Sequence, residues 1–196
     1  EGVSEKIIAC AKEEFLQKGY SDASLRTIAA KAGTTTGSIY SRFQDKEGLF
    51  SAIVEPAADH LVQRFLHIQE TFHGLEEEQQ PKEMKHYVSS GMVEMIDYIY
   101  DNFEVFELLL DASYGTKFQD FVERLVEIEK YMDVIHYRTE DGEVINEDFI
   151  HIMTRALFES MFEVVRHKMT KEKALRYMDM LEKYHYGGWN AILKWE

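Results

Sequence analysis

Small hydroxyl side chains, a glycine and basic side chains crowd residues 24–46, a combination suited to binding nucleic acid. Hydroxyl and main-chain N–H groups at the start of a helix bind phosphate oxygens, and an arginine further along can reach a guanine edge. The outward positions of the second helix expected here are Thr35, Thr36, Gly37, Ser38, Tyr40, Ser41 and Arg42. Taken alone, such a segment also fits a capped helix that merely faces solvent.

Two short helices joined by a tight turn are expected to position these residues. Ser24 is placed to cap the first helix, Ile28 points inward from it, and Gly33 makes the turn. Ile39 and Phe43, four residues apart, anchor the second helix to a core. A helix-turn-helix is built in this way, with one bracing helix and one that enters the DNA major groove. Glycine costs a helix about 1 kcal/mol relative to alanine, so the glycine in the second helix indicates a close backbone approach by DNA.

A further helix is expected over residues 4–18. Its buried face repeats at Ala11 and Phe15, and Gly19 stands where a left-handed residue ends a helix. Cys10 lies beside this face and is the single cysteine, which excludes an intrachain disulfide and fits a reducing cytoplasm. No basic pair or second cysteine is near it, so we interpret it as a small core residue and not as a redox sensor.

Charge is unevenly distributed along the 196 residues, whose formal net charge is −14. Residues 1–50 carry seven basic and seven acidic side chains, so the whole excess of negative charge lies in residues 51–196. An acidic C-terminal body would repel phosphates and orient the N-terminal part toward DNA. The alternative, equally compatible with composition alone, is that the acidic side chains only keep the protein soluble.

Composition predicts an all-α protein without a membrane span. Hydrophobic residues make up 45% and charged residues 30%, long amphipathic segments dominate, and only two prolines occur. No apolar run approaches the roughly 20 residues that cross a bilayer, and there is no signal-peptide pattern, so we expect a cytoplasmic protein. No nucleophile elbow, phosphate loop or cysteine-rich metal motif occurs, and we expect no catalytic residues, metal or cofactor.

Residues 7–50 resemble the DNA-binding domain of the TetR family of bacterial transcriptional regulators. The matching elements are Ile7-Ile8, Ala11, Phe15, Gly19-Tyr20, Leu25-Arg26-x-Ile28-Ala29, Ala32-Gly33, Gly37-Ser-Ile-Tyr40, Phe43 and Asp45-Lys46-Glu47-x-Leu49-Phe50. The resemblance implies an all-α fold. It has an N-terminal three-helix helix-turn-helix DNA-binding domain, residues 1–46, and a C-terminal helical ligand-binding and dimerisation domain, residues 47–196.

The resemblance also implies how the DNA is contacted. Ser24 and Arg26 would approach the DNA backbone or a base edge, and Tyr40 and Lys46 would contact phosphates. Thr35, Thr36 and Gly37 would face the major groove. The complete set of predicted DNA-contacting residues is Ser24, Arg26, Thr35, Thr36, Gly37, Tyr40, Ser41, Arg42 and Lys46. Two residues depart from the family pattern. Ala23 stands where threonine is usual, and Thr36 where a basic residue is frequent, so the base preference does not carry over.

Beyond residue 46 the sequence predicts a series of amphipathic helices. Pro56 should bend the first of them, and polar loops should cover residues 76–81 and 139–148. The predicted helices are 47–72, 82–102, 103–113, 116–137, 147–167 and 171–193. The last two carry broad apolar faces and can form half of a four-helix dimer interface, or they can pack within the monomer. The resemblance implies a homodimer through these last two helices, which would read paired half-sites.

Methionine and aromatic side chains of the C-terminal body can line an adaptable apolar pocket, although such stripes at helical spacing more often form a core. The candidate pocket residues are Met92, Met95, Tyr98, Phe106, Phe158 and Phe162. The resemblance implies a pocket for a small-molecule effector that releases DNA. Nearby acids can favour a cationic ligand, or can simply face solvent; they are Glu94, Asp97, Glu159 and Glu163.

The sequence therefore predicts a DNA-binding transcriptional regulator. It is expected to be a ligand-responsive repressor that binds a palindromic operator in double-stranded DNA as a dimer. The alternative is a di-iron carboxylate helical-bundle enzyme, because Glu83 with His86 and Glu182 with His185 match the Glu-x-x-His motif of that class. Lysines beside both motifs indicate surface positions, which disfavours the alternative.

Overall fold

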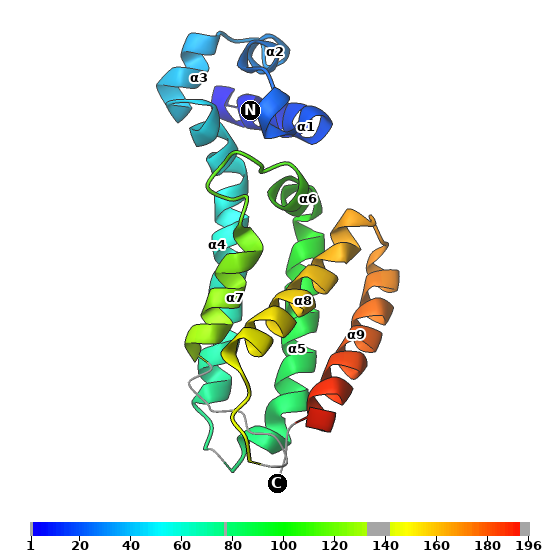
Figure 1. The fold of residues 1–196 in the computed structure, drawn as a ribbon. Helices are drawn as coiled ribbons and strands as arrows, with labels where there is room; N and C mark the ends of the chain where they lie inside the picture. The colour runs from blue at the N-terminus through cyan, green and yellow to red at the C-terminus, as the bar shows by residue number, and fades with distance from the viewer. Residues whose placement is uncertain (1, 77, 133–141, 193–196) are drawn as a thin grey trace. The chain divides into compact units, whose positions relative to one another are not determined.

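Nine α-helices make up most of the residues that the computed structural model describes, which are 2–76, 78–132 and 142–192 (Figure 1). In chain order they are α1 Val3–Asp22, α2 Leu25–Lys31, α3 Thr36–Phe43, α4 Lys46–His73, α5 Gln80–Asp101, α6 Phe103–Asp111, α7 Phe121–Met132, α8 Glu147–Arg166 and α9 Lys171–Ile192. None of them is long and apolar enough to cross a membrane. The end of the predicted helix 116–137 and the start of the predicted loop 139–148 fall outside the described residues.

The chain divides into two compact units. Unit 1 comprises Glu1–His60 and Asn102–Phe121, and unit 2 comprises Leu61–Asp101 and Val122–Glu196. Helix α4 therefore contributes its first half to unit 1 and its second half to unit 2, and the segment that contains α6 returns to unit 1. The predicted domains, 1–46 and 47–196, group the helices by expected function, whereas these units group them by packing.

Helix α1 buries the face that its sequence predicts. Ile7, Ala11 and Phe15 are fully buried, and Cys10 beside them is half-buried. Gly19 interrupts the helix near its end with a φ of 74° and a ψ of 167°, a conformation open to glycine because it has no Cβ. The predicted break at this residue is confirmed.

An aromatic cluster forms the centre of unit 1. The rings of Phe15 and Phe50 meet edge to face with centroids 5.1 Å apart, and Tyr20 meets Phe50 at 5.3 Å. Phe118 adds a ring from the returning segment, 6.2 Å from Phe50. Because the N–H of Tyr20 also donates to the main-chain oxygen of Ala112 over 3.0 Å, the end of α1 is joined to the end of α6 by both packing and hydrogen bonding.

The chain between α6 and α7 is a hydrogen-bonded turn and not the first turn of a helix that the sequence predicts from residue 116. The buried hydroxyl of Thr116 donates to the main-chain oxygen of Ser113 over 2.7 Å and accepts from the N–H of Phe118 over 3.1 Å. Gly115 has a φ of 86°. A threonine hydroxyl that bonds to nearby backbone groups in this way competes with helix formation, so α7 begins only at Phe121.

Unit 2 packs the second half of α4 with α5, α7, α8 and α9, and Figure 1 shows α8 and α9 side by side. Phe65 of α4 meets Phe158 of α8 edge to face at 5.0 Å. The hydroxyl of Tyr100 on α5 donates to the main-chain oxygen of Met169 over 2.8 Å, just before α9. Gly91 of α5 faces Ile68 of α4, where a Cβ would come within 3.3 Å of the isoleucine side chain. Of these residues, Phe65, Ile68, Gly91 and Phe158 also line the cavity described below.

Candidate nucleic-acid interface

Local hydrogen bonds fix the start of both short helices in the segment 24–46. The hydroxyl of Ser24 accepts from the N–H of Thr27 over 3.3 Å and caps α2, as the sequence predicts. The hydroxyl of Thr35 accepts from the N–H of Ser38 over 3.2 Å and caps α3. Gly33 between the helices has a φ of 66°. The segment therefore forms the predicted helix-turn-helix.

Helix α3 turns one face to the core and the opposite face to solvent. Ile39 is fully buried, whereas Tyr40 is 52% exposed. The predicted DNA-contacting positions that are exposed are Arg26, Thr35, Gly37, Tyr40, Ser41 and Arg42, and those that are half-buried are Ser24, Thr36 and Lys46. An anchored helix with an outer row of hydroxyl and basic groups has the form of a major-groove reading helix.

Arg42 lies along its own helix in this structure. Its Nη1 donates to the hydroxyl of Ser38 over 2.6 Å and to the main-chain oxygen of the same residue over 3.3 Å. Both bonds are exposed, so water can replace them at small cost when the side chain swings outward. The arginine side chain therefore lies along the outer face of α3.

Gly37 is not required by the fold. A Cβ built there would meet the hydroxyl oxygen of Thr35 at 3.7 Å, an ordinary contact, and the residue is exposed within α3. Glycine nevertheless weakens a helix relative to alanine. Its position on the outer face leaves the backbone open to an approaching surface.

Gly48 shows the opposite case. A Cβ there would lie 1.9 Å from the main-chain oxygen of Phe43, so only glycine fits where the chain turns from α3 into α4. Asp45 caps α4 through its Oδ1, which accepts from the N–H of Gly48 over 2.7 Å. The tight turn at this junction fixes the orientation of α3 relative to the start of α4.

Lys46 follows that cap and reaches back to α1. Its ammonium donates to the main-chain oxygen of Ser21 over 2.9 Å and lies 4.9 Å from the ring centre of Tyr20. Burial lowers the pKa of the Lys46 ammonium from its ordinary value. An ammonium has three N–H donors, so the predicted phosphate contact is compatible with this one bond.

A buried carboxylate that sequence reasoning missed braces α2 against α1. Glu14 is 1% exposed and bonds to Lys18 at 2.9 Å. It also accepts from the N–H of Ser24 over 3.3 Å, and Lys31 lies 3.8 Å away. The hydrogen bond from Lys18 is the main cause that lowers the pKa of the Glu14 carboxyl. The spacing of Glu14 and Lys18, four residues apart on one helix, was the available signal.

Unit 2 contains an apolar cavity of about 170 Å³ between α4, α5, α8 and α9. Its lining residues are Phe65, Ile68, Gln69, Phe72, His73, Met84, Tyr87, Val88, Gly91, Met92, Met95, Ile150, Thr154, Leu157, Phe158, Met161, His185 and Trp189. Three of the six predicted pocket residues, Met92, Met95 and Phe158, lie in this lining.

The other three predicted pocket residues lie elsewhere. Phe106 and Phe162 are fully buried in the packing of unit 1 and unit 2 respectively, because they fill the space between helices. Tyr98 lies over Arg64, whose Cζ is 5.1 Å from the ring centre, and borders a shallow surface depression.

Among the described residues that line the cavity there is no carboxylate, lysine or arginine. Its polar groups include two histidines, of which His185 accepts a hydrogen bond from the indole N–H of Trp189 over 2.8 Å. Burial lowers the pKa of both His73 and His185, which favours neutral imidazoles at pH 7. Acids considered for a cationic ligand instead form ion pairs outside the cavity, as Glu94 does with Arg64 at 2.7 Å.

The two Glu-x-x-His motifs do not meet in a metal centre. His185 lines the cavity, whereas His86 borders the shallow depression beside Tyr98. Within the part of the chain that the structure describes, neither motif belongs to a group of three or more metal-ligating side chains. The geometry gives the di-iron alternative no support.

Comparison with known proteins agrees with the geometry of the N-terminal segment. A family model described as bacterial regulatory proteins, tetR family, matches residues 7–53. The HTH-type transcriptional repressor BepR of Brucella suis biovar 1 (strain 1330) is 40% identical over 50 residues, 26% of this chain and 24% of BepR. The HTH-type transcriptional regulator AcrR of Shigella flexneri is 41% identical over 68 residues, 35% of this chain and 32% of AcrR. The matches thus span a quarter to a third of the length of these curated relatives.

Solved structures share the fold over almost the whole chain. NalD, described as the secondary repressor of the MexAB-OprM multidrug efflux pump in Pseudomonas aeruginosa, superposes with a TM-score of 0.64 at 18% identity, covering 98% of this chain and 96% of NalD. SmeT is described as the repressor of the Stenotrophomonas maltophilia multidrug efflux pump SmeDEF. It superposes with a TM-score of 0.59 at 18% identity, covering 99% of this chain and 92% of SmeT. The helix-turn-helix match and the shared all-helical fold agree. Residues 7–53 therefore match the tetR family of bacterial regulatory proteins, and the described chain shares the all-helical fold of these solved structures.

Proposed function

We propose that this protein is a transcriptional repressor that binds a double-stranded DNA operator through the outer face of α3. The observation that carries the proposal is the capped α3, anchored by Ile39 and exposing hydroxyl groups, a glycine and Arg42 on its outer face. The names of BepR, NalD and SmeT, each described as a repressor, support the direction of regulation. A role on chromosomal DNA places the protein in the cytoplasm.

The second part of the proposal is a homodimer formed through α8 and α9. Ile152 on α8 is 57% exposed, and Met180 and Tyr184, four residues apart on α9, are 64% and 82% exposed. Burial of such apolar surface against the same patch of a second copy favours a two-fold dimer. Two copies carry two α3 helices and would read a palindromic operator with half-sites roughly 34–36 Å apart or a multiple of that spacing.

The third part is release of DNA by a small effector bound in the cavity of unit 2. The described lining is mainly aromatic and aliphatic and includes no side chain that is charged at neutral pH, which fits an uncharged aromatic ligand with one or two hydrogen-bonding groups. Helix α5 contributes to the cavity and continues into α6 after Asn102, and α6 packs on α1. A ligand that favours one position of α5 would therefore bias the helix on which the helix-turn-helix rests.

Gel-shift and footprinting assays with genomic fragments test the DNA-binding proposal. We expect a palindromic site whose affinity falls steeply with salt, because phosphate contacts release counterions. Arg42→Ala should weaken binding, whereas Lys85→Ala, which removes an exposed lysine of α5, is the matched control and should bind as the unmodified chain does. The absence of any salt-sensitive palindromic site would refute the proposal.

A further inference from the structure

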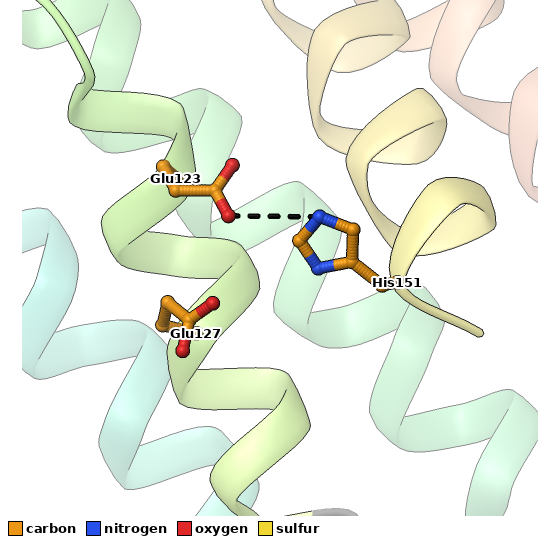
Figure 2. Close-up of side chains that lie close together, drawn as sticks. All are labelled: Glu123, Glu127 and His151. Carbon is orange, nitrogen blue, oxygen red and sulfur yellow. Dashed lines mark ion pairs between the residues drawn. The ribbon is translucent and has the colours of Figure 1, made fainter. Parts of the chain in front are cut away.

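Three side chains with metal-ligating atoms converge between α7 and α8 of unit 2, outside the cavity lining (Figure 2). Glu123 and Glu127 are four residues apart on α7 and so share one face of that helix. His151 comes from the start of α8. One carboxylate oxygen from each glutamate and one imidazole nitrogen all lie within 4.8 Å of one another. Figure 2 shows the imidazole turned toward Glu123, with Glu127 one helical turn away.

Glu123 uses its two oxygens for different partners. Oε2 accepts a hydrogen bond from Arg155 Nη1 over 2.6 Å, whereas Oε1 lies 3.6 Å from His151 Nε2, which is too long for a strong hydrogen bond. Arg155 therefore orients the carboxylate and leaves Oε1 directed at the imidazole. An ion bound at Oε1 would replace the long contact and keep the bond to Arg155, which is the outer-shell arrangement that steadies many metal ligands.

The charge and exposure of the group favour a cation. The two carboxylates bring two negative charges to the group, and the guanidinium of Arg155 offsets one of them. Glu127 is exposed and has no ion pair with another described side chain, so no such pair has to break when its carboxylate rotates toward an ion. The side chains of Glu123 and His151 are each 31% exposed, so an ion from solvent can reach them, while the surrounding protein restricts their movement.

We propose that Glu123, Glu127 and His151 bind a divalent transition-metal ion, with Zn²⁺ as the expected occupant. A mixed set of one imidazole and two carboxylates suits zinc, whereas magnesium and calcium prefer oxygen ligands alone. Ligand atoms around a tetrahedral ion stand about 3.4 Å apart when the bonds are about 2.1 Å long. In the structure the three ligand atoms lie within 4.8 Å of one another, so a bound ion would draw them closer together, and Glu127 is the most exposed of the three side chains. Three protein ligands leave the fourth position to water.

A bound ion would join α7 to α8 directly. In the structure the two helices are linked at this point by Glu123 with Arg155 and by the weaker contact to His151. An ion that binds the folded chain and not the unfolded one stabilises the fold in proportion to the logarithm of its concentration. Metal binding should therefore be visible both as a stoichiometry and as a rise in the melting temperature.

The test uses the full chain without an affinity tag, stripped with a chelator and titrated with Zn²⁺ in a calorimeter. We expect one ion per chain, and a visible absorption band when Co²⁺ takes the place of zinc. His151→Gln and Glu127→Gln should each weaken zinc binding by at least about tenfold. The matched control is His167→Gln, because His167 also faces a glutamate four residues away, Glu163 at 3.1 Å, without belonging to the three-ligand group.

Circular dichroism of each metal-free variant shows whether it is folded. Zinc affinity that is unchanged in folded His151→Gln, or lost in His167→Gln, would overturn the proposal, and so would binding weaker than about 0.1 mM in the unmodified chain. Equal binding of Mg²⁺ at the same residues would overturn the choice of ion class. No DNA enters the experiment, so its result is independent of the proposed repressor function.

Discussion

The ammonium of Lys46 donates to the main-chain oxygen of Ser21 over 2.9 Å and thereby ties the first turn of α4 to the last turn of α1. The lysine also lies 4.9 Å from the ring centre of Tyr20, which belongs to the aromatic cluster of unit 1. This residue therefore has a structural partner as well as its predicted phosphate contact, and a substitution there acts on both.

Lys46→Ala should lower the free energy of unfolding by about 1 kcal/mol, because it removes a charge-assisted hydrogen bond that is only half-buried. It should also weaken operator binding across all sequences and reduce the slope of affinity against salt by about one. Urea unfolding and gel shifts at several salt concentrations measure the two effects. Lys46→Arg keeps the charge, so a loss of salt slope in that variant would contradict the phosphate contact.

Gly37→Ala should stabilise the protein while weakening DNA binding. Alanine fits without a clash, since the nearest atom to its Cβ is 3.7 Å away, and it raises helix stability by about 1 kcal/mol. The added methyl group lies on the outer face of α3 and would hold a DNA surface away from the backbone. The melting temperature should therefore rise in thermal unfolding, while the affinity for the operator should fall in gel shifts. Tighter operator binding by this variant would show that the glycine serves no close approach.

Glu14→Gln should remove a pH-dependent part of the stability of unit 1. The native pKa of Glu14 is lowered, chiefly by the hydrogen bond from Lys18. The stabilisation by the carboxylate is thus present above about pH 4.5, the ordinary pKa of the group, and is lost as the pH falls through the lower native pKa. At pH 7 the variant should be less stable by about 1–2 kcal/mol. Urea unfolding of both proteins from pH 7 to pH 3 should show this difference shrinking, and a constant difference would contradict the prediction.

The charge preference of the cavity can be inverted with one substitution. The unmodified chain should bind neutral aromatic compounds more tightly than cations of the same shape, because the described lining of the cavity contains no carboxylate. Gln69→Glu places one there and should raise the affinity for the cation by about tenfold, since an opposite charge is worth roughly 1–2 kcal/mol in a partly buried site. Thermal shift with matched pairs of compounds measures both preferences. A preference for the cation in the unmodified chain would rule out the proposed ligand class.

The proposed dimer should dissociate when charge is placed on the exposed apolar patch of α8 and α9. Ile152→Glu with Met180→Glu would bury two carboxylates in each half of the interface, a cost of several kcal/mol. Light scattering at micromolar concentration should then report a monomer. Tyr114→Glu is the matched control, because Tyr114 is 81% exposed but lies in unit 1. A monomeric unmodified chain would remove the basis for paired half-sites.

The local features of the fold could be predicted from the sequence because they depend on neighbouring residues. The caps at Ser24, the turn at Gly33 and the buried faces of α1 and α3 follow from side-chain type and helical spacing alone. The stop at Thr116 could not be predicted, since its hydroxyl competes with the helix only when a turn has already brought Ser113 close.

The cavity shows where sequence reasoning reached its limit. Methionine and aromatic content predicted a pocket in the C-terminal body, and Met92 does line it, but Phe106 and Phe162 fill the core. An apolar stripe predicts which face of a helix is buried. It does not predict whether side chains of a neighbouring helix fill the space next to that face or leave a cavity. Phe65 and Ile68, three residues apart on α4, also form an apolar stripe and line the cavity, but they are not among the residues predicted from the sequence.

The returning segment 102–121 makes the DNA-reading part of this chain inseparable from the rest. A fragment that ended at His60 would keep every residue of the helix-turn-helix but would lose Phe118 from the cluster around Phe50 and the carbonyl of Ala112 that holds Tyr20. The helix-turn-helix therefore depends on α6 and the turn after it for part of its packing, and a fragment of the first sixty residues alone would lack that support.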